Sequence, residues 1–265
     1  MHIISLNNYP NKGFIQYQKT PQKTNFKGCC RDYMDYTLAH CNQTGGLIST
    51  YTQIFRRDFD WKRFVEILDE NFKDYKTVNL YSLACSDGSE AYTTAISVME
   101  NSNNPEKFTK ILATDRDDKI IEFAQKRRIN LTEHEEKILL ENSKKQQYFG
   151  DKKEPALLEG EPKATFIRHS FEPNDELKSK IDFKCEDILT TLSKLEDKGN
   201  SAILCRNVFP YLSIEAQVDV YKMLLKKLKP GSLFVLGQFD KNSELFKLIQ
   251  KSGFQKLESF IFRRI

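Results

Sequence analysis

Two stretches of this chain combine residue types that could hold a nucleotide-like cofactor. Residues 79–99 begin with apolar, strand-type side chains, pass through small residues at 84–86 and an Asp-Gly turn signal, and continue with helical spacing. The small residues allow a ligand to approach the backbone closely. A second apolar strand, 111–113, leads to Asp115. A carboxylate at the carboxyl end of such a strand can accept hydrogen bonds from both hydroxyls of a ribose, as in nucleotide-binding folds.

The alternative role for Asp115 is to cap the helix that follows it. Asp117 already supplies that cap, because it precedes the helical apolar pattern of residues 120–124. We therefore predict that Asp115 binds a ribose. The turn before it is not the dinucleotide fingerprint G-x-G-x-x-G, since only Gly88 is present.

The elements that must position these residues alternate between strand and helix from residue 78 onward. Further strands are predicted to end near 185–187 and 205–207 and to span 232–239, and helices are predicted at 213–228 and near 242–252. The last residues, 253–265, are predicted to form two short strands in a hairpin. This alternation predicts an α/β fold, a doubly wound and mostly parallel sheet with helices on both faces and a terminal antiparallel strand.

The chain is predicted to form one domain, at residues 48–265, preceded by a partly ordered N-terminal arm. Residues 1–47 are polar and broken by proline and glycine, without sustained periodicity. Within the domain, residues 130–180 are charged and irregular, and we expect substrate contacts there. The arm holds four soft metal ligands whose spacing is not that of a zinc site, so we expect no metal: Cys29, Cys30, His40 and Cys41.

Composition limits the class of protein. With 41 basic and 37 acidic residues, the net charge of +4 is too balanced to indicate a nucleic-acid partner. No apolar run approaches the roughly 18 residues that a membrane span requires, and the N-terminus lacks the pattern of a secretory signal. Six cysteines in 265 residues do not form a disulfide framework, so we interpret them as reduced thiols. We expect a cytoplasmic monomer that does not insert into a membrane.

Five ordered motifs give the chain a family resemblance. ACSDGSEAYT at 84–93 is similar to A-C-S-T-G-E-E-P-Y-S, AILCRNVFPYL at 202–212 to F-C-R-N-V-x-I-Y-F, and TQIFRR at 52–57 to T-x-F-F-R. ILATDRDDKIIEFA and LKKLKPGSLFVLG resemble two further segments of the same family. Over about residues 48–265 the chain resembles the S-adenosylmethionine-dependent glutamate O-methyltransferases of bacterial chemotaxis, the CheR type. The resemblance implies a seven-stranded, Rossmann-like methyltransferase sheet.

The resemblance also implies a site for S-adenosylmethionine and its product, S-adenosylhomocysteine. Thr52 and Arg56 would contact the methionine portion, and Glu90 would face its cationic amino or sulfonium end. Asp115 would hold the ribose. The other implied cofactor-binding positions are Thr50 and Ala84, with Asp187 and Ile188 bordering the adenine and Asn207 and Val208 closing the pocket.

The implied reaction is methyl transfer to a carboxylate of a protein or a small molecule. A carboxylate is ionised at neutral pH, so the reaction needs no general base, and the protein must mainly position and desolvate the nucleophile. Tyr211 and Arg206 are the implied catalytic residues near the transferred methyl. Arg206 or Arg56 could pair with the acceptor carboxylate, and Tyr211 could donate a hydrogen bond to it. For Arg206, an ion pair at the end of its strand is the alternative.

Several positions depart from the family pattern. Thr50 and Asp187 stand where asparagine is usual, and Glu90 is flanked by serine and alanine instead of glutamate and proline. The family's helical N-terminal docking domain is missing or reduced to the arm. These departures motivate an alternative function, a non-catalytic cofactor-binding or protein-interaction module on a degenerate methyltransferase fold. A nucleic-acid methyltransferase is disfavoured because residues 207–210 read Asn-Val-Phe-Pro, which is unlike Asn-Pro-Pro-Tyr.

Overall fold

A seven-stranded sheet forms the centre of the protein. The computed structural model describes residues 52–265, apart from 53, 127–128, 133–135, 138–146 and 154–166, so the predicted arm and its boundary at residue 47 lie outside the description. The strands of this sheet are β1 (Asn79–Leu83), β2 (Ile111–Asp115), β6 (Ile181–Cys185), β7 (Ser201–Leu204), β8 (Leu233–Val235), β9 (Phe254–Glu258) and β10 (Ile261–Arg264).

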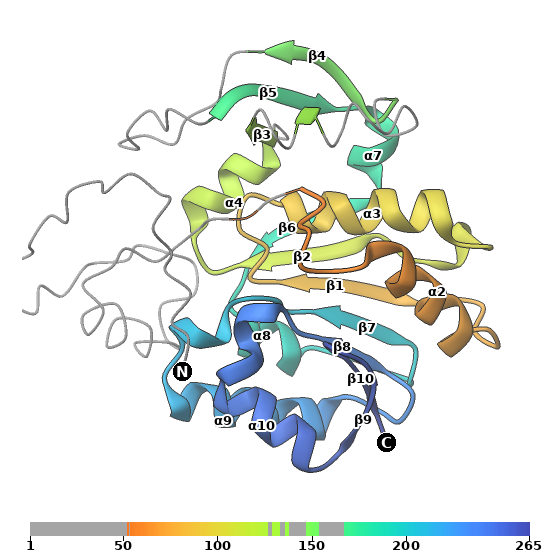
Figure 1. The fold of residues 1–265 in the computed structure, drawn as a ribbon, viewed down its shortest axis with the longest axis vertical. Coiled ribbons are helices and arrows are strands. Elements are labelled where there is room, and N and C mark those ends of the chain that lie inside the picture. The colour runs from red at the N-terminus through yellow and green to blue at the C-terminus, as the bar shows by residue number, and fades with distance from the viewer. Residues whose placement is uncertain (1–51, 53, 127–128, 133–135, 138–146, 154–166) are drawn as a thin grey trace, which may run out of the picture.

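The strand order is β6-β2-β1-β7-β8-β10-β9 (Figure 1). All neighbours pair in parallel except at β10, which runs antiparallel to both β8 and β9. The predicted doubly wound, mostly parallel sheet of seven strands with an antiparallel terminal hairpin is confirmed. In such a sheet, ligands bind at the carboxyl ends of the parallel strands.

Helices cover both faces of the sheet (Figure 1). One face carries α2 (Trp61–Asn71), α3 (Ser89–Asn101) and α4 (Asp118–Gln125), and the other carries α8 (Ile188–Ser193), α9 (Ile214–Lys227) and α10 (Glu244–Lys251). Side chains alternate between the two cores along each central strand. In β7, Ala202 and Leu204 belong to one core, and Ile203 belongs to the other. Because both faces are buried, these strands read as continuous apolar runs in the sequence.

The loops after β7 and β8 contain short 3₁₀ turns, η2 (Phe209–Tyr211) and η3 (Gln238–Asn242), and a third, η1 (Pro105–Lys107), follows α3. The predicted helix at 213–228 is α9, whose N-cap Ser213 accepts the N–H of Ala216. It ends before Pro230 and Gly231, and the glycine has a left-handed backbone (φ 98°). Local cap and turn chemistry therefore set the ends of this helix where the sequence predicts them.

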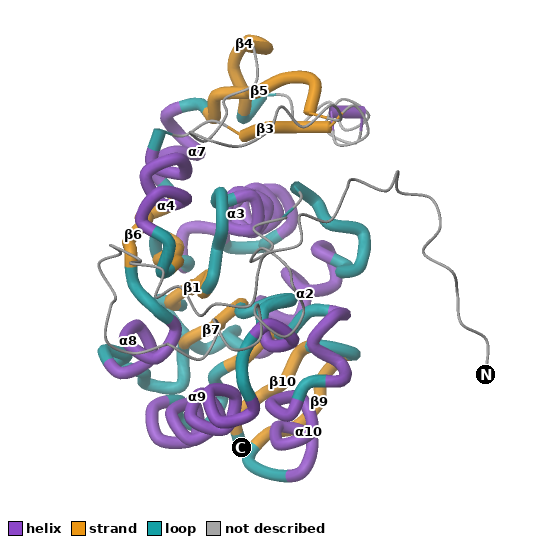
Figure 2. The backbone as a smooth tube through the Cα atoms, turned by 90° about the vertical axis from the view of Figure 1, so that its left-hand side faces the viewer, coloured by secondary structure: helices purple, strands orange, loops and turns teal. Residues whose placement is uncertain are grey.

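A second, antiparallel sheet of three strands occupies the region that we predicted to be irregular. β3 (Ile129–Thr132), β4 (Phe149–Lys153) and β5 (Ile167–Pro173) are ordered β3-β5-β4. This sheet lies beyond α3 and α4, next to the short helix α7 (Asp175–Ser179), away from the central sheet (Figure 2). The strands were missed because they pair across long stretches of sequence, and β4 and β5 carry charged residues that interrupt the apolar pattern.

The cysteines do not share one state, contrary to our interpretation of all six as reduced thiols. Cys85 and Cys205 are free and buried, and burial raises the pKa of both thiols. Cys185 is disulfide-bonded. Within the described part of the chain, no helix combines the length and apolarity needed to cross a membrane.

Candidate functional site

Three residues at the carboxyl edge of the sheet have a left-handed backbone although none is a glycine. They are Ala84 (φ 55°) and Ser86 (φ 52°) after β1, and Asn207 (φ 61°) after β7. Because β1 and β7 are parallel neighbours, these turns lie at the same edge. Such conformations are uncommon for side chains other than glycine, and they cluster where proteins bind ligands. This edge is the candidate functional site.

Asp115 lies at the end of β2, beside the turn that follows β1. Its Oδ2 accepts the N–H of Ser86 at 3.0 Å and its Oδ1 accepts the N–H of Asp117 at 3.1 Å. Burial raises the pKa of this carboxyl, while the two N–H groups lower it. Each carboxylate oxygen can accept a further hydrogen bond. Asp115 is therefore fixed by the backbone and still able to accept two ligand hydroxyls.

Two neighbours of Asp115 have structural roles. Asp117 caps α4, as predicted, because its Oδ1 accepts the N–H groups of Lys119 (3.0 Å) and Ile120 (3.3 Å). Gly88 has φ 88°, and a Cβ there would lie 2.7 Å from the ring of Phe183 on β6. The glycine is thus required by the turn and by its packing on β6.

Arg206, after β7, is enclosed by acidic and aromatic side chains, and only 2% of its side chain is exposed. Its Nη2 donates to Asp58 Oδ1 at 3.0 Å and its Nη1 to Glu90 Oε2 at 3.3 Å. Its Cζ lies 4.3 Å from the ring centroid of Phe59 and 5.1 Å from that of Trp61, which favours a cation. These contacts are those of the ion-pair alternative, and direct contact with an acceptor stays a prediction.

Glu90, in the first turn of α3, connects β1 to this ion pair. Its Oε1 accepts the hydroxyl of Ser82 at 2.9 Å. Burial raises the pKa of Glu90, and Arg206 lowers it. Together Glu90, Asp58, Arg206 and Arg56 make a cluster of two carboxylates and two guanidiniums. The charge of Glu90 is balanced within the protein, so its contact with the cationic end of a cofactor stays a prediction.

Arg56 is the second guanidinium of the site and is less committed than Arg206. Its Nε lies 3.6 Å from Asp58 Oδ1, and its Cζ lies 5.0 Å from the ring centroid of Phe239. Its terminal nitrogens have no partner among the residues that the structure describes. The neighbouring Phe55 donates its N–H to Thr93 Oγ1 at 3.0 Å, which holds this segment against α3. Arg56 can therefore bind an anion that enters the site.

Asp240, in η3 after β8, also lies at the edge of the candidate site, and the sequence analysis did not predict a role for it. Its Oδ2 accepts the N–H groups of Asn207 at 2.6 Å and Gly237 at 2.8 Å, and its Oδ1 accepts that of Phe209 at 3.1 Å. The side chain is fully buried, and this burial raises its pKa to about 6. In return, Asn207 Oδ1 accepts the N–H of Phe239 at 3.0 Å. Asp240 thus joins the loops after β7 and β8 and holds Asn207 in its left-handed conformation.

The residues predicted to border the adenine have mainly local contacts. Asp187 is buried and caps α8, with Oδ1 accepting the N–H of Thr190 at 2.9 Å and Oδ2 its hydroxyl at 2.7 Å. Ile188 is buried in the first turn of α8. Aspartate and asparagine both cap helices well, so aspartate at position 187, where the family usually has asparagine, preserves this cap. A contact of either residue with adenine stays a prediction.

The remaining predicted residues are placed as follows. Thr50 lies outside the described residues, and Thr52, Val208 and Tyr211 are half-buried. The structure brings to one edge of the sheet most of the predicted set: Arg56, Ala84, Glu90, Asp115, Arg206, Asn207 and Val208.

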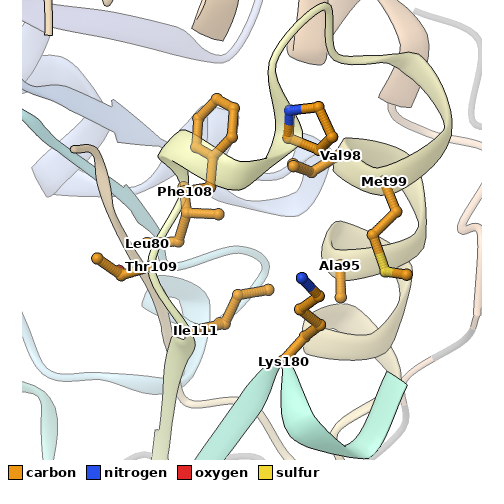
Figure 3. A pocket seen from close by; sticks show the side chains of 9 residues that line it. Leu80, Ala95, Val98, Met99, Phe108, Thr109, Ile111 and Lys180 are labelled. Atoms are coloured by element: carbon orange, nitrogen blue, oxygen red, sulfur yellow. The ribbon is translucent and has the colours of Figure 1, made fainter. Parts of the chain in front are cut away.

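A separate hollow lies at the opposite edge of the sheet (Figure 3). Leu80 and Ile111, near the amino-terminal ends of β1 and β2, line it together with apolar side chains of α3, and Lys180 reaches its rim. This position is remote from Asp115 and its neighbours. The hollow therefore contributes nothing to the candidate site.

The chain matches one family model and is similar to several solved structures. Residues 50–259 match the model of the CheR methyltransferase, SAM binding domain. Among solved structures, the chain is similar to a SAM-dependent O-methyltransferase from Thermotoga maritima, with 14% identity, a TM-score of 0.41, and coverage of 78% of this chain and 54% of that one. It is also similar to magnesium protoporphyrin IX methyltransferase from Synechocystis PCC 6803, with 12% identity, a TM-score of 0.34, and coverage of 85% and 88%. The chain thus spans about half of the Thermotoga structure.

The described residues fit the cofactor of that family. Asp115 can accept ribose hydroxyls, and the left-handed turns at Ala84 and Asn207 flank the same edge. The matched segment covers most of the chain and includes every one of these positions. The protein therefore belongs to the CheR methyltransferase family and contains its S-adenosylmethionine-binding domain.

Proposed function

We propose that the protein is an S-adenosylmethionine-dependent methyltransferase that methylates the oxygen of a carboxylate. The observation that carries this proposal is the pairing, at one edge, of two complementary groups. Asp115 is held by two N–H groups and can accept the hydroxyls of the cofactor. Arg56 keeps terminal N–H groups that can bind a carboxylate, either that of the cofactor's methionine portion or that of the acceptor.

The cofactor, when bound, supplies an activated methyl group on a sulfonium. The task of the chain is then to hold the acceptor oxygen in line and to remove water from it. Arg56 would orient the acceptor through N–H groups in the plane of its guanidinium. A carboxylate is already ionised at neutral pH, so the described groups need not remove a proton from it.

Arg206 and Glu90 would act as positioning residues in this site. Arg206 links β7 to α3 through Glu90, and to the segment of Asp58, so its loss would leave two largely buried carboxylates with only Ser82 and Arg56 as their partners. Tyr211, in η2, would donate a hydrogen bond to the acceptor. These roles predict that substituting Arg206 disturbs stability and turnover together, whereas substituting Tyr211 lowers turnover.

Calorimetric titration with S-adenosylhomocysteine tests the cofactor half of the proposal. Wild-type protein should bind it, Asp115→Ala should lose binding, and Asp118→Ala should retain it because Asp118 is exposed in the adjacent helix. Absence of binding by wild-type protein would contradict the proposal.

Transfer of a labelled methyl group tests the acceptor half. Carboxylic acids and glutamate-containing peptides should receive label that mild alkali releases as methanol, because methyl esters hydrolyse and methylamines do not. Alkali-stable label would exclude the carboxylate acceptor.

A non-catalytic cofactor-binding module remains the second candidate. This candidate is favoured because both terminal nitrogens of Arg206 pair with Asp58 and Glu90, which leaves neither of them for an acceptor. Such a module would bind S-adenosylhomocysteine without consuming S-adenosylmethionine in the presence of any acid tested. Turnover, measured as formation of S-adenosylhomocysteine, separates the two candidates.

A further inference from the structure

We infer that Gln217 is a positioning residue that sets the place of Tyr211 in the site. This inference rests on the proposed function, in which Tyr211 acts on the acceptor, and adds a residue that acts through it. Gln217 lies near the start of α9 and only 5% of its surface is exposed, although its side chain is an amide. Burial of an amide is costly unless its donors and its acceptor have partners.

The amide of Gln217 bonds to three backbone groups from two other segments. Its Nε2 donates to the carbonyl oxygen of Phe209 at 2.9 Å and to that of Leu212 at 3.0 Å. Its Oε1 accepts the N–H of Leu245, in the first turn of α10, at 3.1 Å. One side chain therefore fastens the turn η2 to both α9 and α10.

The two carbonyls that Gln217 holds stand on either side of Tyr211. η2 begins at Phe209, and Leu212 follows its last residue, Tyr211. Within the turn, the N–H of Tyr211 donates to the carbonyl of Val208 at 3.0 Å, and that of Leu212 donates to the carbonyl of Phe209 at 3.1 Å. A 3₁₀ turn has few hydrogen bonds of its own, and their geometry is poor. Bonds from Gln217 at both ends of the turn therefore fix its position.

Asp240 and Gln217 divide the loop after β7 between them. Asp240 accepts the N–H groups of Asn207 and Phe209, whereas Gln217 donates to the carbonyl of Phe209 and beyond it. The backbone of Phe209 is thus held on one side by an acceptor and on the other by a donor. We assign the start of the loop, with Asn207 at the cofactor pocket, to Asp240, and its end, with Tyr211, to Gln217.

The surroundings of Gln217 favour positioning over simple packing. Its neighbours on the buried face of α9 are apolar and include Ala216, Val220 and Leu224. An apolar side chain at position 217 would continue this face, but it would leave the backbone groups at both ends of η2 without their bonds. A displacement of about 1 Å in a reacting site can cost about a hundredfold in rate. Loss of Gln217 should therefore lower turnover more than cofactor binding.

The first test compares Gln217→Met with Asp240→Asn in the full chain. Methionine keeps the length of glutamine without its hydrogen-bonding groups. Gln217→Met should keep the affinity for S-adenosylhomocysteine within about threefold of wild type and lower kcat for methyl transfer to carboxylic acids and glutamate-containing peptides at least about tenfold. Asp240→Asn should weaken S-adenosylhomocysteine binding about three- to tenfold. Gln217→Glu, which can still accept from Leu245 but loses both donors, should behave as Gln217→Met.

The second test follows Tyr211 directly and needs neither cofactor nor acceptor. With 3-fluorotyrosine incorporated at Tyr211, the fluorine NMR resonance of the protein without ligand should be shifted or split by Gln217→Met. Leu224→Ala is the matched control and should leave the resonance unchanged. Leu224 is buried on the same helix, two turns farther along and about 10 Å from Gln217, so its truncation lowers stability at a distance from η2.

Three results would overturn the inference. They are an unchanged fluorine resonance in Gln217→Met, a shifted resonance with full turnover, and a loss of S-adenosylhomocysteine affinity in Gln217→Met as large as that in Asp240→Asn. Absence of methyl transfer by wild-type protein would instead contradict the proposed function. The fluorine measurement still decides, in that case, whether Gln217 positions Tyr211, so the two failures are separate.

Discussion

Two carboxylates follow strands at the same edge of the sheet, and the protein holds them differently. Asp115 ends β2 and accepts two backbone N–H groups, one at each oxygen. Asp240 follows β8 and accepts three, two of them at Oδ2, with none of its surface exposed. Burial raises the pKa of both carboxyls. The same chemical group therefore serves two purposes within one site.

The difference lies in what remains available to a ligand. Asp115 is half-buried and keeps hydrogen-bonding capacity at both oxygens, whereas Asp240 is fully buried and its three bonds join two loops out of reach of a ligand. The two arginines differ in the same way. Both terminal nitrogens of Arg206 pair with carboxylates of the chain, and those of Arg56 have no partner among the described residues. We expect groups with remaining capacity to bind ligands and fully satisfied groups to hold the site together.

Removal of the Asp240 carboxylate should have the largest effect on stability. Asp240→Ala leaves three buried N–H groups without a partner and releases Asn207 from its left-handed conformation. Each unsatisfied group costs about 1–3 kcal/mol, so we expect a loss of about 3–5 kcal/mol in the free energy of unfolding. Urea denaturation measures this loss. A change below about 1 kcal/mol, similar to that of the exposed control Asp118→Ala, would show that Asp240 does not hold the two loops together.

Asp115→Ala should show the reverse pattern. Two N–H groups at the edge of the site lose their partner but can be reached by water, so the stability loss should be only about 1–2 kcal/mol. Affinity for S-adenosylhomocysteine should fall about a hundredfold, since two hydrogen bonds from ribose hydroxyls to a charged group are lost. Calorimetry and thermal denaturation of one preparation measure both quantities. A large stability loss with unchanged affinity would show that Asp115, like Asp240, is structural.

The raised pKa of Asp240 makes its contribution to stability depend on pH. Its usual value of 3.8 describes the unfolded chain, and burial brings the folded value to about 6. Between about pH 4 and 6 the folded protein retains a proton that the unfolded chain has lost. Stability therefore falls as the pH rises through this window and is level above it, with a total change of at most about 3 kcal/mol.

The matched variant for this pH effect is Asp240→Asn, which has a similar shape and does not titrate. The difference in unfolding free energy between wild-type protein and the variant, measured from pH 4.5 to 7.5, isolates the contribution of Asp240. A constant difference across the range would show that the carboxylate keeps its usual pKa.

Much of this arrangement can be predicted from local sequence. The strands β2 and β7 contain continuous apolar runs, ILA and AIL, and Asp115 stands where such a strand meets a helical pattern. The small sheet cannot be predicted in this way, because β4 and β5 carry charged residues and pair only with each other and β3. Strand pairing of this kind depends on contacts that local periodicity does not report.

The roles of Arg206 and Asp240 also depend on distant contacts. Arg206 pairs with Glu90, 116 residues away, and Asp240 accepts N–H groups from residues 31 and 33 positions earlier. In the sequence both look like polar residues after a strand, as Asp115 does. The residue type and its place at a strand end identify the site, but only the tertiary contacts separate ligand-binding groups from structural ones.

The smallest effect should come from Asp117, which tests whether the neighbour of Asp115 takes part in binding. Its side chain accepts the N–H groups of Lys119 and Ile120, and it contributes only its backbone N–H to Asp115. Asp117→Ala should therefore cost about 1 kcal/mol of stability through loss of the cap. Affinity for S-adenosylhomocysteine should stay within about twofold of wild type, because alanine keeps the backbone N–H that orients Asp115. Restoration of stability by Asp117→Ser, without a change in affinity, would confirm the cap, whereas a large loss of affinity in Asp117→Ala would mean that two carboxylates, and not one, receive the ribose.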